Sequence, residues 1–380
     1  MASKIGSCAR YAVNAASRKV LNERFRKALV ERYYSIRSSL VNHSAEYAPH
    51  TPIDLLDWRR TLDFRYRCSR GVYRGNCFYG AGYWMQQYAG FDSTAKAAIE
   101  HGVYFGNYVN DAELDGSGLP CLITFGPSRV SHISAVSNVP IAAVGPYIAY
   151  APDYLSPEDQ VSLKSSLGKV LLVFPSHSVD RVSVAFDFEG LFEDIDQVVE
   201  SNQIDEVLVC LYYRDLLSGA AERYEAKGYR VVTAGYREDL LFLPRLRSLI
   251  RISDLTMSNS VGTHVGYCAF FGKPHRVLRQ SKSFQAASSK DKVEFENDYV
   301  EQSVREKRDV EIAFHDFDSS RMKEEICASY WGFGKTLDAC DMHALLSACE
   351  QAFSTRSSEC QNAFRSIVER SRELSGVVEL

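Results

Sequence analysis

The chain has 380 residues, of which 46% are hydrophobic and 24% are charged, and its formal net charge is −4. This length suits two α/β domains of ordinary size, and this composition is typical of a soluble globular protein. The weakly negative charge gives no basic field that would favour a nucleic-acid partner, and no apolar run is long enough to span a bilayer.

The N-terminal sequence and the cysteines both indicate a cytoplasmic protein. Residues 1–13 (MASKIGSCARYAV) lack the basic-then-apolar order of a secretory signal. The ten cysteines are scattered without a CxxC pair. We therefore interpret them as reduced thiols and not as disulfides or zinc ligands.

A basic helix is predicted within residues 18–39, where Val20, Leu21 and Phe25 recur at helical spacing between Arg and Lys. We favour an amphipathic helix packed on the core. The alternative is peripheral contact with the inner face of the cytoplasmic membrane. The residues that would make this contact are Arg24, Arg26, Lys27 and Arg32.

Short elements are predicted for the rest of the first half. Residues 50–90 are rich in Arg, Tyr and Gly, which indicates loops with short helices. The pattern then predicts a helix over 95–100, a strand over 120–125, a turn over 126–129 and a strand over 141–144. Residues 145–168 contain three prolines and are interpreted as the connection between two domains.

Strands and helices alternate regularly in the second half, which predicts a parallel sheet with helices on both faces. A further strand begins at Ser253, and a short helix follows it and ends at Gly272, where Pro274 prevents its continuation. Residues 281–309 are predicted to be a charged loop, and 337–368 one or two helices. The other strands are predicted over 169–174, 206–213 and 229–233, and the other helices over 186–202, 217–227 and 240–250.

The run from Ser258 to His264 is the most informative feature. A helix N-terminus offers free N–H groups and a positive dipole end, so it can bind phosphate without a metal. Gly262 would let a phosphate come close to the backbone. The alternative is an ordinary capped helix, with His264 on its surface. The candidate phosphate ligands are Ser258, Asn259, Ser260, Gly262, Thr263 and His264.

Two further polar clusters follow predicted strands of the same sheet, at the edge where ligands bind. Ser176, His177 and Ser178 could hydrogen-bond a phosphate or a base, or they could form a Pro-containing turn. Asp215 could bond a ribose, act as a base or nucleophile, or cap a helix.

Another cluster, Glu100-His101-Gly102, lies in the first half. A histidine before a glycine at the end of an element can point into a cleft and act as a base near pH 7. A histidine bonded within the core or at the surface is the alternative.

Several common motifs do not occur in the sequence: GxxxxGK[ST], GxGxxG after a first strand, HExxH and GxSxG. Asp316 and Asp318 form a single DFD run. We interpret it as a solvated turn and only weakly as a metal site.

Together, FPSHS (174–178), LVCLYYRD (208–215) and DLTMSNSVGTHVGYCAFFGKPH (254–275) resemble the donor-binding domain of GT-B glycosyltransferases. The branch that they are similar to is the sialyl- and Kdo-transferases of bacterial surface-polysaccharide assembly. EHGVYFGN (100–107) and TFGPSR (124–129) extend the resemblance to the first half. It implies an α/β GT-B fold with two Rossmann-like domains facing across a cleft. Residues 1–155 would bind the acceptor, 168–335 the donor, and helices in 336–380 would pack back on the first domain.

The resemblance also implies roles for the candidate residues, without a metal or a cofactor. Ser258, Ser260 and Thr263 would hold the donor phosphate, beside Asn259, Gly262 and His264. His177, with Ser176 and Ser178, would bind phosphate or the nucleotide. His101, next to Glu100, would be the base of an inverting reaction, and Asp215 the carboxylate of a retaining one. Gly102, Gly126 and Arg129 would line the acceptor side, with Arg129 pairing with an acidic group.

The implied function is transfer of a sugar from a nucleotide-activated donor to an oligosaccharide or lipid-linked acceptor in lipopolysaccharide or capsule assembly. A CMP-linked acidic sugar, Kdo or sialic-acid-like, is the favoured donor. A nucleotide-sugar epimerase, a glycerophosphate-type transferase and a non-catalytic module of a polysaccharide complex remain as alternatives.

Overall fold

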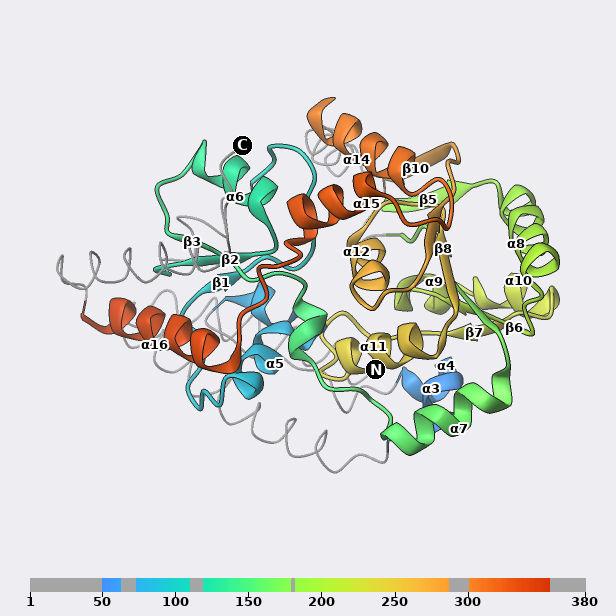
Figure 1. Cartoon of the computed structure of the whole chain (residues 1–380), viewed down its shortest axis with the longest axis horizontal. Coiled ribbons are helices and arrows are strands. Elements are labelled where there is room, and N and C mark those ends of the chain that lie inside the picture. The colour runs from blue at the N-terminus through green and yellow to red at the C-terminus, as the bar shows by residue number, and fades with distance from the viewer. Residues whose placement is uncertain (1–49, 63–72, 110–118, 179–181, 287–300, 356–380) are drawn as a thin grey trace, which may run out of the picture.

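The computed structural model describes residues 50–62, 73–109, 119–178, 182–286 and 301–355 (Figure 1). The predicted basic helix at 18–39, with its possible membrane contact, lies outside these residues. Among the described helices, none is long and apolar enough to cross a membrane.

A five-stranded parallel sheet forms the centre of the second half, with the order β7-β6-β4-β8-β9. Numbered along the chain, this order is 3-2-1-4-5, that of a doubly wound sheet whose ligand site lies where the order reverses, between β4 and β8. The strands are β4 (Val170–Phe174), β6 (Glu206–Cys210), β7 (Arg230–Val232), β8 (Leu255–Ser258) and β9 (His275–Val277).

Helices cover both faces of this sheet, as the alternation of buried residues in β4 requires. Leu171 and Val173 pack in one apolar cluster with α8 (Phe188–Asn202) and α10 (Ala221–Ala226). Val170, Leu172 and Phe174 pack in another cluster with α7 (Pro157–Leu167), α11 (Phe242–Ile252) and α12 (Thr263–Phe270). The predicted parallel sheet with helices on both faces is therefore confirmed.

A smaller parallel sheet, of order β1-β2-β3, forms the first half. Its strands are β1 (Ala98–Ile99), β2 (Leu122–Thr124) and β3 (Ile141–Ala143), and α6 (Pro127–Ser134) packs on one face. The other face packs against α5 (Ala81–Tyr88) and α16 (Ala339–Thr355). The shorter elements of this half are α3 (Pro52–Leu56), α4 (Trp58–Thr61), η2 (Arg74–Gly80) and η3 (Tyr147–Tyr150).

The helix predicted over 95–100 is wrong, because this segment contains strand β1. Ala98 and Ile99 are fully buried and pair with Leu122 and Ile123 of β2. Burial inside a parallel sheet outweighs the helix propensity of an alanine-rich run.

Three other differences concern segment type. The helix predicted over 217–227 begins only at α10, after a turn at Gly219 (φ 87°), and a separate short helix, α9 (Tyr213–Leu217), precedes it. Strands β5 (Val182–Phe186) and β10 (Lys282–Ala286) form an antiparallel ribbon that was not predicted. Helix α14 (Glu301–Ala313) occupies part of the predicted 281–309 loop, and its buried side combines the polar Ser303 and Glu306 with Val310 and Ala313.

The DFD run is closed by a lysine from α15 (Arg321–Ile326). The Lys323 Nζ donates to the backbone oxygens of Asp316 (2.7 Å) and Asp318 (2.6 Å) and lies 3.1 Å from Asp316 Oδ1. Within the described ranges, no cluster of His, Cys, Asp and Glu could hold a metal ion. The run is therefore a lysine-bound turn.

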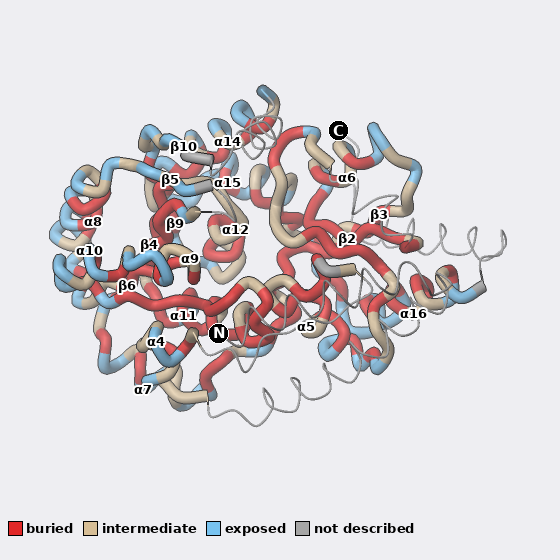
Figure 2. The backbone as a smooth tube through the Cα atoms, turned by 180° about the vertical axis from the view of Figure 1, so that it is seen from behind, coloured by how far each residue is buried: buried red, intermediate tan, exposed pale blue. Residues whose placement is uncertain are grey.

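The C-terminal segment joins the two halves (Figure 1). After α15, the π-helical turn η4 (Cys327–Trp331) leads back to the first half, where α16 lies beside α5. The Trp331 indole is fully buried between Phe105 (ring centroids 5.9 Å apart) and α12, and its Nε1 donates to the backbone oxygen of Thr263 (3.1 Å). Buried residues of both sheets belong to one apolar cluster, and Figure 2 shows the buried backbone running between the two halves.

We expect Gly266→Ala to destabilise the protein by about 1–3 kcal/mol, the usual cost of overpacking. A Cβ at Gly266 would lie 2.1 Å from Trp331 Cγ. Denaturant unfolding measures the cost. In a Trp331→Leu background the same change should cost less than about 1 kcal/mol, because the obstructing ring is gone. An equal cost in both backgrounds would contradict this packing.

Candidate functional site

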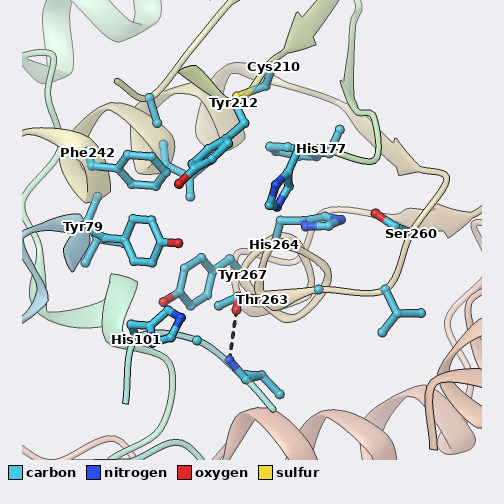
Figure 3. Close-up of a pocket in the computed structure, with 18 of the residues that line it drawn as sticks. Tyr79, His101, His177, Cys210, Tyr212, Phe242, Ser260, Thr263, His264 and Tyr267 are labelled. Atoms are coloured by element: carbon cyan, nitrogen blue, oxygen red, sulfur yellow. Dashed lines mark hydrogen bonds between the residues drawn. The ribbon is translucent and has the colours of Figure 1, made fainter. Parts of the chain in front are cut away.

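A pocket of about 290 Å³ lies between the two sheets (Figure 3). The first half contributes Tyr79 and the loop 101–104. The second half contributes segments that follow β4, β6, β7 and β8, together with the start of α11 and of α12. The pocket therefore lies at the carboxyl ends of the strands, where the order of the second sheet predicts a ligand.

The N-terminus of α12 forms one wall of this pocket. Gly262 is its N-cap residue, with extended backbone (φ −166°), and no side chain caps the helix. The Val265 N–H donates to the backbone oxygen of Gly262 (3.2 Å), and the N–H groups of Thr263 and His264, which have no acceptor within the helix, are available to an anion. Ser260, Gly262 and Thr263 all line the pocket, as the sequence predicted for a phosphate site.

His264 is a neutral polar group in the same wall. Its ring stacks on Phe174 (centroids 4.9 Å apart), and its Nε2 is buried without a hydrogen-bond partner in the described part of the chain. Burial, with a smaller effect from His177, lowers the pKa of His264 to about 3. An unpartnered nitrogen at a pocket wall can bond a ligand, and at neutral pH it does so as an uncharged imidazole.

Three of the predicted phosphate ligands lie behind this wall and do not line the pocket. The Asn259 Oδ1 accepts from the backbone N (2.6 Å) and Oγ (2.9 Å) of Ser176, and Asn259 Nδ2 donates to Gln280 (2.9 Å). Ser258 Oγ donates to the backbone oxygen of Ser260 (2.9 Å) and lies 3.1 Å from His275 Nε2. Ser176, Ser258 and Asn259 are thus corrected from ligand-binding to structural residues, because their polar groups are satisfied internally.

His177 lines the pocket, whereas Ser178 and Asp215 do not. The His177 ring lies against Tyr212, with centroids 4.6 Å apart. The Asp215 carboxylate instead accepts from the backbone N of Ser178 (3.3 and 3.4 Å). Burial raises the pKa of Asp215, although the hydrogen bonds from Ser178 act in the opposite direction. Asp215 therefore supports the loop that carries His177, and the prediction of a nucleophile at this position is corrected.

Glu100 and Arg129 form a buried ion pair and are not exposed to a substrate. The Arg129 Nη2 lies 2.7 Å from Glu100 Oε1, and the side chains are 2% and 0% exposed. Thr124 Oγ1 donates to the same carboxylate (2.5 Å). A Cβ at Gly126 would lie 2.6 Å from the backbone oxygen of Ser329. The predicted catalytic role of Glu100 and acceptor-binding roles of Gly126 and Arg129 are therefore corrected, because these groups are enclosed by protein.

His101 and Gly102 do line the pocket, in a loop of the first half that approaches the start of α12 (Figure 3). The His101 ring packs on the edge of Phe78 (centroids 5.3 Å apart), and its Nδ1 lies 2.9 Å from the hydroxyl of Tyr104. The Arg129 guanidinium lies over the Tyr104 ring, 5.1 Å from its centroid. The buried ion pair thus supports the residue that orients His101.

The sequence analysis missed the aromatic part of the pocket. Tyr79, Tyr212, Phe242 and Tyr267 line the side opposite Ser260, with Tyr212 against the ring of His177 (Figure 3). Tyr79 and Phe242 lie with ring centroids 4.6 Å apart. Tyr79 has a left-handed backbone (φ 60°), which is unusual outside glycine. The strand predicted over 206–213 included Tyr212, whereas β6 ends at Cys210, so no local signal in the sequence indicated Tyr212 at the pocket.

The pocket therefore combines an anion-binding wall with an aromatic wall. Among the described residues that line it there is no Asp, Glu, Lys or Arg. Such a site can stack a planar ring and hold one anionic group by backbone amides, hydroxyls and imidazoles.

No protein-family model and no curated protein matches the chain. Among solved structures it is similar to Staphylococcus aureus MnaA bound to UDP (TM-score 0.33, 12% identity, 62% of this chain and 60% of the other). It is also similar to a proposed UDP-N-acetylglucosamine 2-epimerase of Listeria monocytogenes (TM-score 0.31, 14% identity, 63% and 61%). A third is a UDP-glucose:anthocyanidin 3-O-glucosyltransferase in complex with UDP (TM-score 0.26, 12% identity, 78% and 69%).

The chain spans less than two thirds of the length of the first two of these proteins. At such TM-scores the alignments carry no argument about activity. The fold follows from the coordinates themselves: two parallel sheets face one pocket, and the C-terminal segment returns to the first sheet. This is the α/β arrangement of the GT-B type that the sequence predicted.

We expect His264→Phe to reduce the loss of stability in acid. Unfolded histidine takes up a proton below about pH 6.5, whereas folded His264 does so only near pH 3. The folded state is therefore disfavoured as the pH falls through this window, by about 2 kcal/mol between pH 7 and pH 5. Denaturant unfolding of both proteins at the two pH values measures the difference. The lowered pKa of His275 comes first from burial, which is the same in both proteins, so its main contribution cancels. Equal losses in the two proteins would contradict a depressed pKa.

Proposed function

We propose that this protein is a metal-independent glycosyltransferase that uses a nucleotide-activated sugar and acts in the cytoplasm on a saccharide or lipid-linked acceptor of surface-polysaccharide assembly. One observation carries the proposal: the uncapped N-terminus of α12 and the His101 imidazole line the same pocket, to which both halves of the chain contribute. A phosphate leaving group and an acceptor hydroxyl are the two partners that such a pair suits.

The donor phosphate would bind at the start of α12. Backbone N–H groups of the first turn and the hydroxyls of Ser260 and Thr263 would hold its oxygens, with the imidazoles of His177 and His264 beside them. These donors are fixed before the reaction, so they stabilise the negative charge that develops on the departing phosphate. The base would stack on the aromatic wall formed by Tyr79, Tyr212 and Phe242.

His101 would act as the general base. It would take the proton of the acceptor hydroxyl while the acceptor oxygen bonds to the anomeric carbon and the bond to the donor phosphate breaks. Since no carboxylate is present among the described lining residues, the pocket favours direct displacement with inversion over a carboxylate-bound intermediate.

The nucleotide we favour is CMP, which carries one phosphate in its sugar conjugates. The pocket offers one helix N-terminus and no described Lys or Arg, so a single phosphate suits it better than a diphosphate does. Arg129 was predicted to pair with the acidic group of a Kdo- or sialic-acid-like sugar, but it forms an ion pair with Glu100 instead. The proposal of a CMP-linked donor therefore rests on the single phosphate of CMP and not on a partner for the acidic sugar.

We expect CMP to raise the melting temperature more than UDP, GDP or ADP does, because a ligand that binds the folded state stabilises it by mass action. UMP and CDP, tested in parallel, separate the effect of the base from that of the second phosphate. Ser260→Ala should reduce the shift, and EDTA should leave it unchanged. If no nucleotide changes the melting temperature, the proposal fails.

We expect His101→Gln to lower turnover by about 10²–10⁴-fold, the range for loss of a general base. Nucleotide affinity should stay within about threefold, because His101 is not among the groups proposed to hold the phosphate or the base. The assay is release of CMP from a CMP-sugar in the presence of a glycolipid extract, with chromatographic analysis of the sugar product. An intact nucleotide carrying an epimerised sugar would instead support the epimerase alternative.

A further inference from the structure

Thr263 connects the two walls of the pocket directly. It is the first residue of α12, and its Oγ1 accepts a hydrogen bond from the backbone N of Val103 (3.0 Å), drawn as the dashed line in Figure 3. A Cβ at Gly102 would lie 3.1 Å from the same hydroxyl, so the loop approaches Thr263 closely because Gly102 has no side chain. The loop that carries His101 therefore contacts the helix that would hold the donor phosphate.

The same loop is held at its other end by a second contact with the second half of the chain. The backbone N of Gly106 donates to Glu306 Oε2 (2.6 Å) in α14. Thr263 is itself fixed, because its backbone oxygen accepts from the buried Trp331 indole. Of these two hydrogen bonds from loop 101–106, the one accepted by Thr263 lies at the pocket wall.

A threonine hydroxyl can accept two hydrogen bonds and donate one. Val103 uses one acceptor position of Thr263, so the O–H proton is left to donate to another group. At the start of an uncapped helix, an anion bound by the first-turn N–H groups lies within reach of this proton.

We propose that Thr263 is a positioning residue that couples donor binding to the placement of His101, by donating to the donor phosphate while it accepts from Val103. This inference rests on the proposed function and adds a consequence to it: a nucleotide bound at α12 holds loop 101–106 in place through one hydroxyl. Loss of the leaving phosphate would then loosen the loop that carries the base.

The test compares Thr263→Val, which keeps the shape and removes the hydroxyl, with Thr263→Ser, which keeps the hydroxyl. Calorimetric titration with CMP, and with UDP in parallel, should show affinity lowered about tenfold or more in the valine variant, the ratio expected for one hydrogen bond to a charged group. The serine variant should stay within about threefold of the original protein. Thermal melts of both variants establish that they are folded.

Hydrogen exchange of the 101–106 segment provides the readout for coupling. Without nucleotide, exchange should be faster in Thr263→Val than in the original protein or in Thr263→Ser. At saturating CMP, protection of this segment should increase in the original protein and in Thr263→Ser, and clearly less in Thr263→Val. Ser260→Ala, which weakens the phosphate site without touching Val103, should leave exchange without nucleotide unchanged.

The outcomes separate this inference from the proposed function. If nucleotide binds and the 101–106 segment gains equal protection in all variants, the coupling is refuted while nucleotide binding stands. If Thr263→Val binds as tightly as Thr263→Ser, the hydroxyl has no role toward the phosphate and the inference also fails. If no nucleotide binds the original protein, the proposed function fails and the inference fails with it.

Discussion

The side chain of Asn259 is the contact on which the geometry of the site depends. Its Oδ1 accepts two hydrogen bonds from Ser176, directly after β4, and its Nδ2 donates to Gln280, shortly after β9. Because Asn259 itself follows β8, one fully buried amide joins three strand ends. A buried network of this kind is costly to leave partly unsatisfied, so it defines one arrangement of the chain. The start of α12, and with it every group that could meet a phosphate, follows from that arrangement.

The pocket is electrostatically unusual for a site that would bind an anion. Charged groups near it are neutralised inside the protein: Arg129 by Glu100, and Arg245 by Asp239 at 2.7 Å. The pocket wall itself carries imidazoles, phenols and backbone amides. In a buried site, oriented amides act strongly because little water screens them, and they need no rearrangement when charge develops. A ligand with modest negative charge suits such a wall better than a densely charged one.

The parts of the fold that local sequence controls were predicted well. Glycine and proline bound α12 and the strand after it, and the apolar run of β4 can form only a buried strand.

The site was predicted where strand ends carry polar residues, as at His177 and Ser260. It was not predicted where contacts join distant segments. The sequence around Arg129 does not indicate that its guanidinium will pair with Glu100. Tyr79 contacts Phe242 only because the tertiary fold brings these distant segments together. The strand at Ala98–Ile99 was missed for the same reason, since its pairing with β2 is what makes it a strand.

The two halves share one apolar core, and this bears on how the site could work. If each half packed separately, closing the pocket would require only rotation about the connecting segment. Here Trp331 lies between Phe105 and α12, and residues of both sheets belong to the same buried cluster. Tightly packed cores change between discrete arrangements and do not deform gradually. Motion during a reaction is therefore easier for the loops at the pocket rim than for the sheets. Phe105 belongs to this buried core, so the part of loop 101–106 in which a local change at α12 can reach His101 is residues 101–104, which the Thr263 hydroxyl joins to α12.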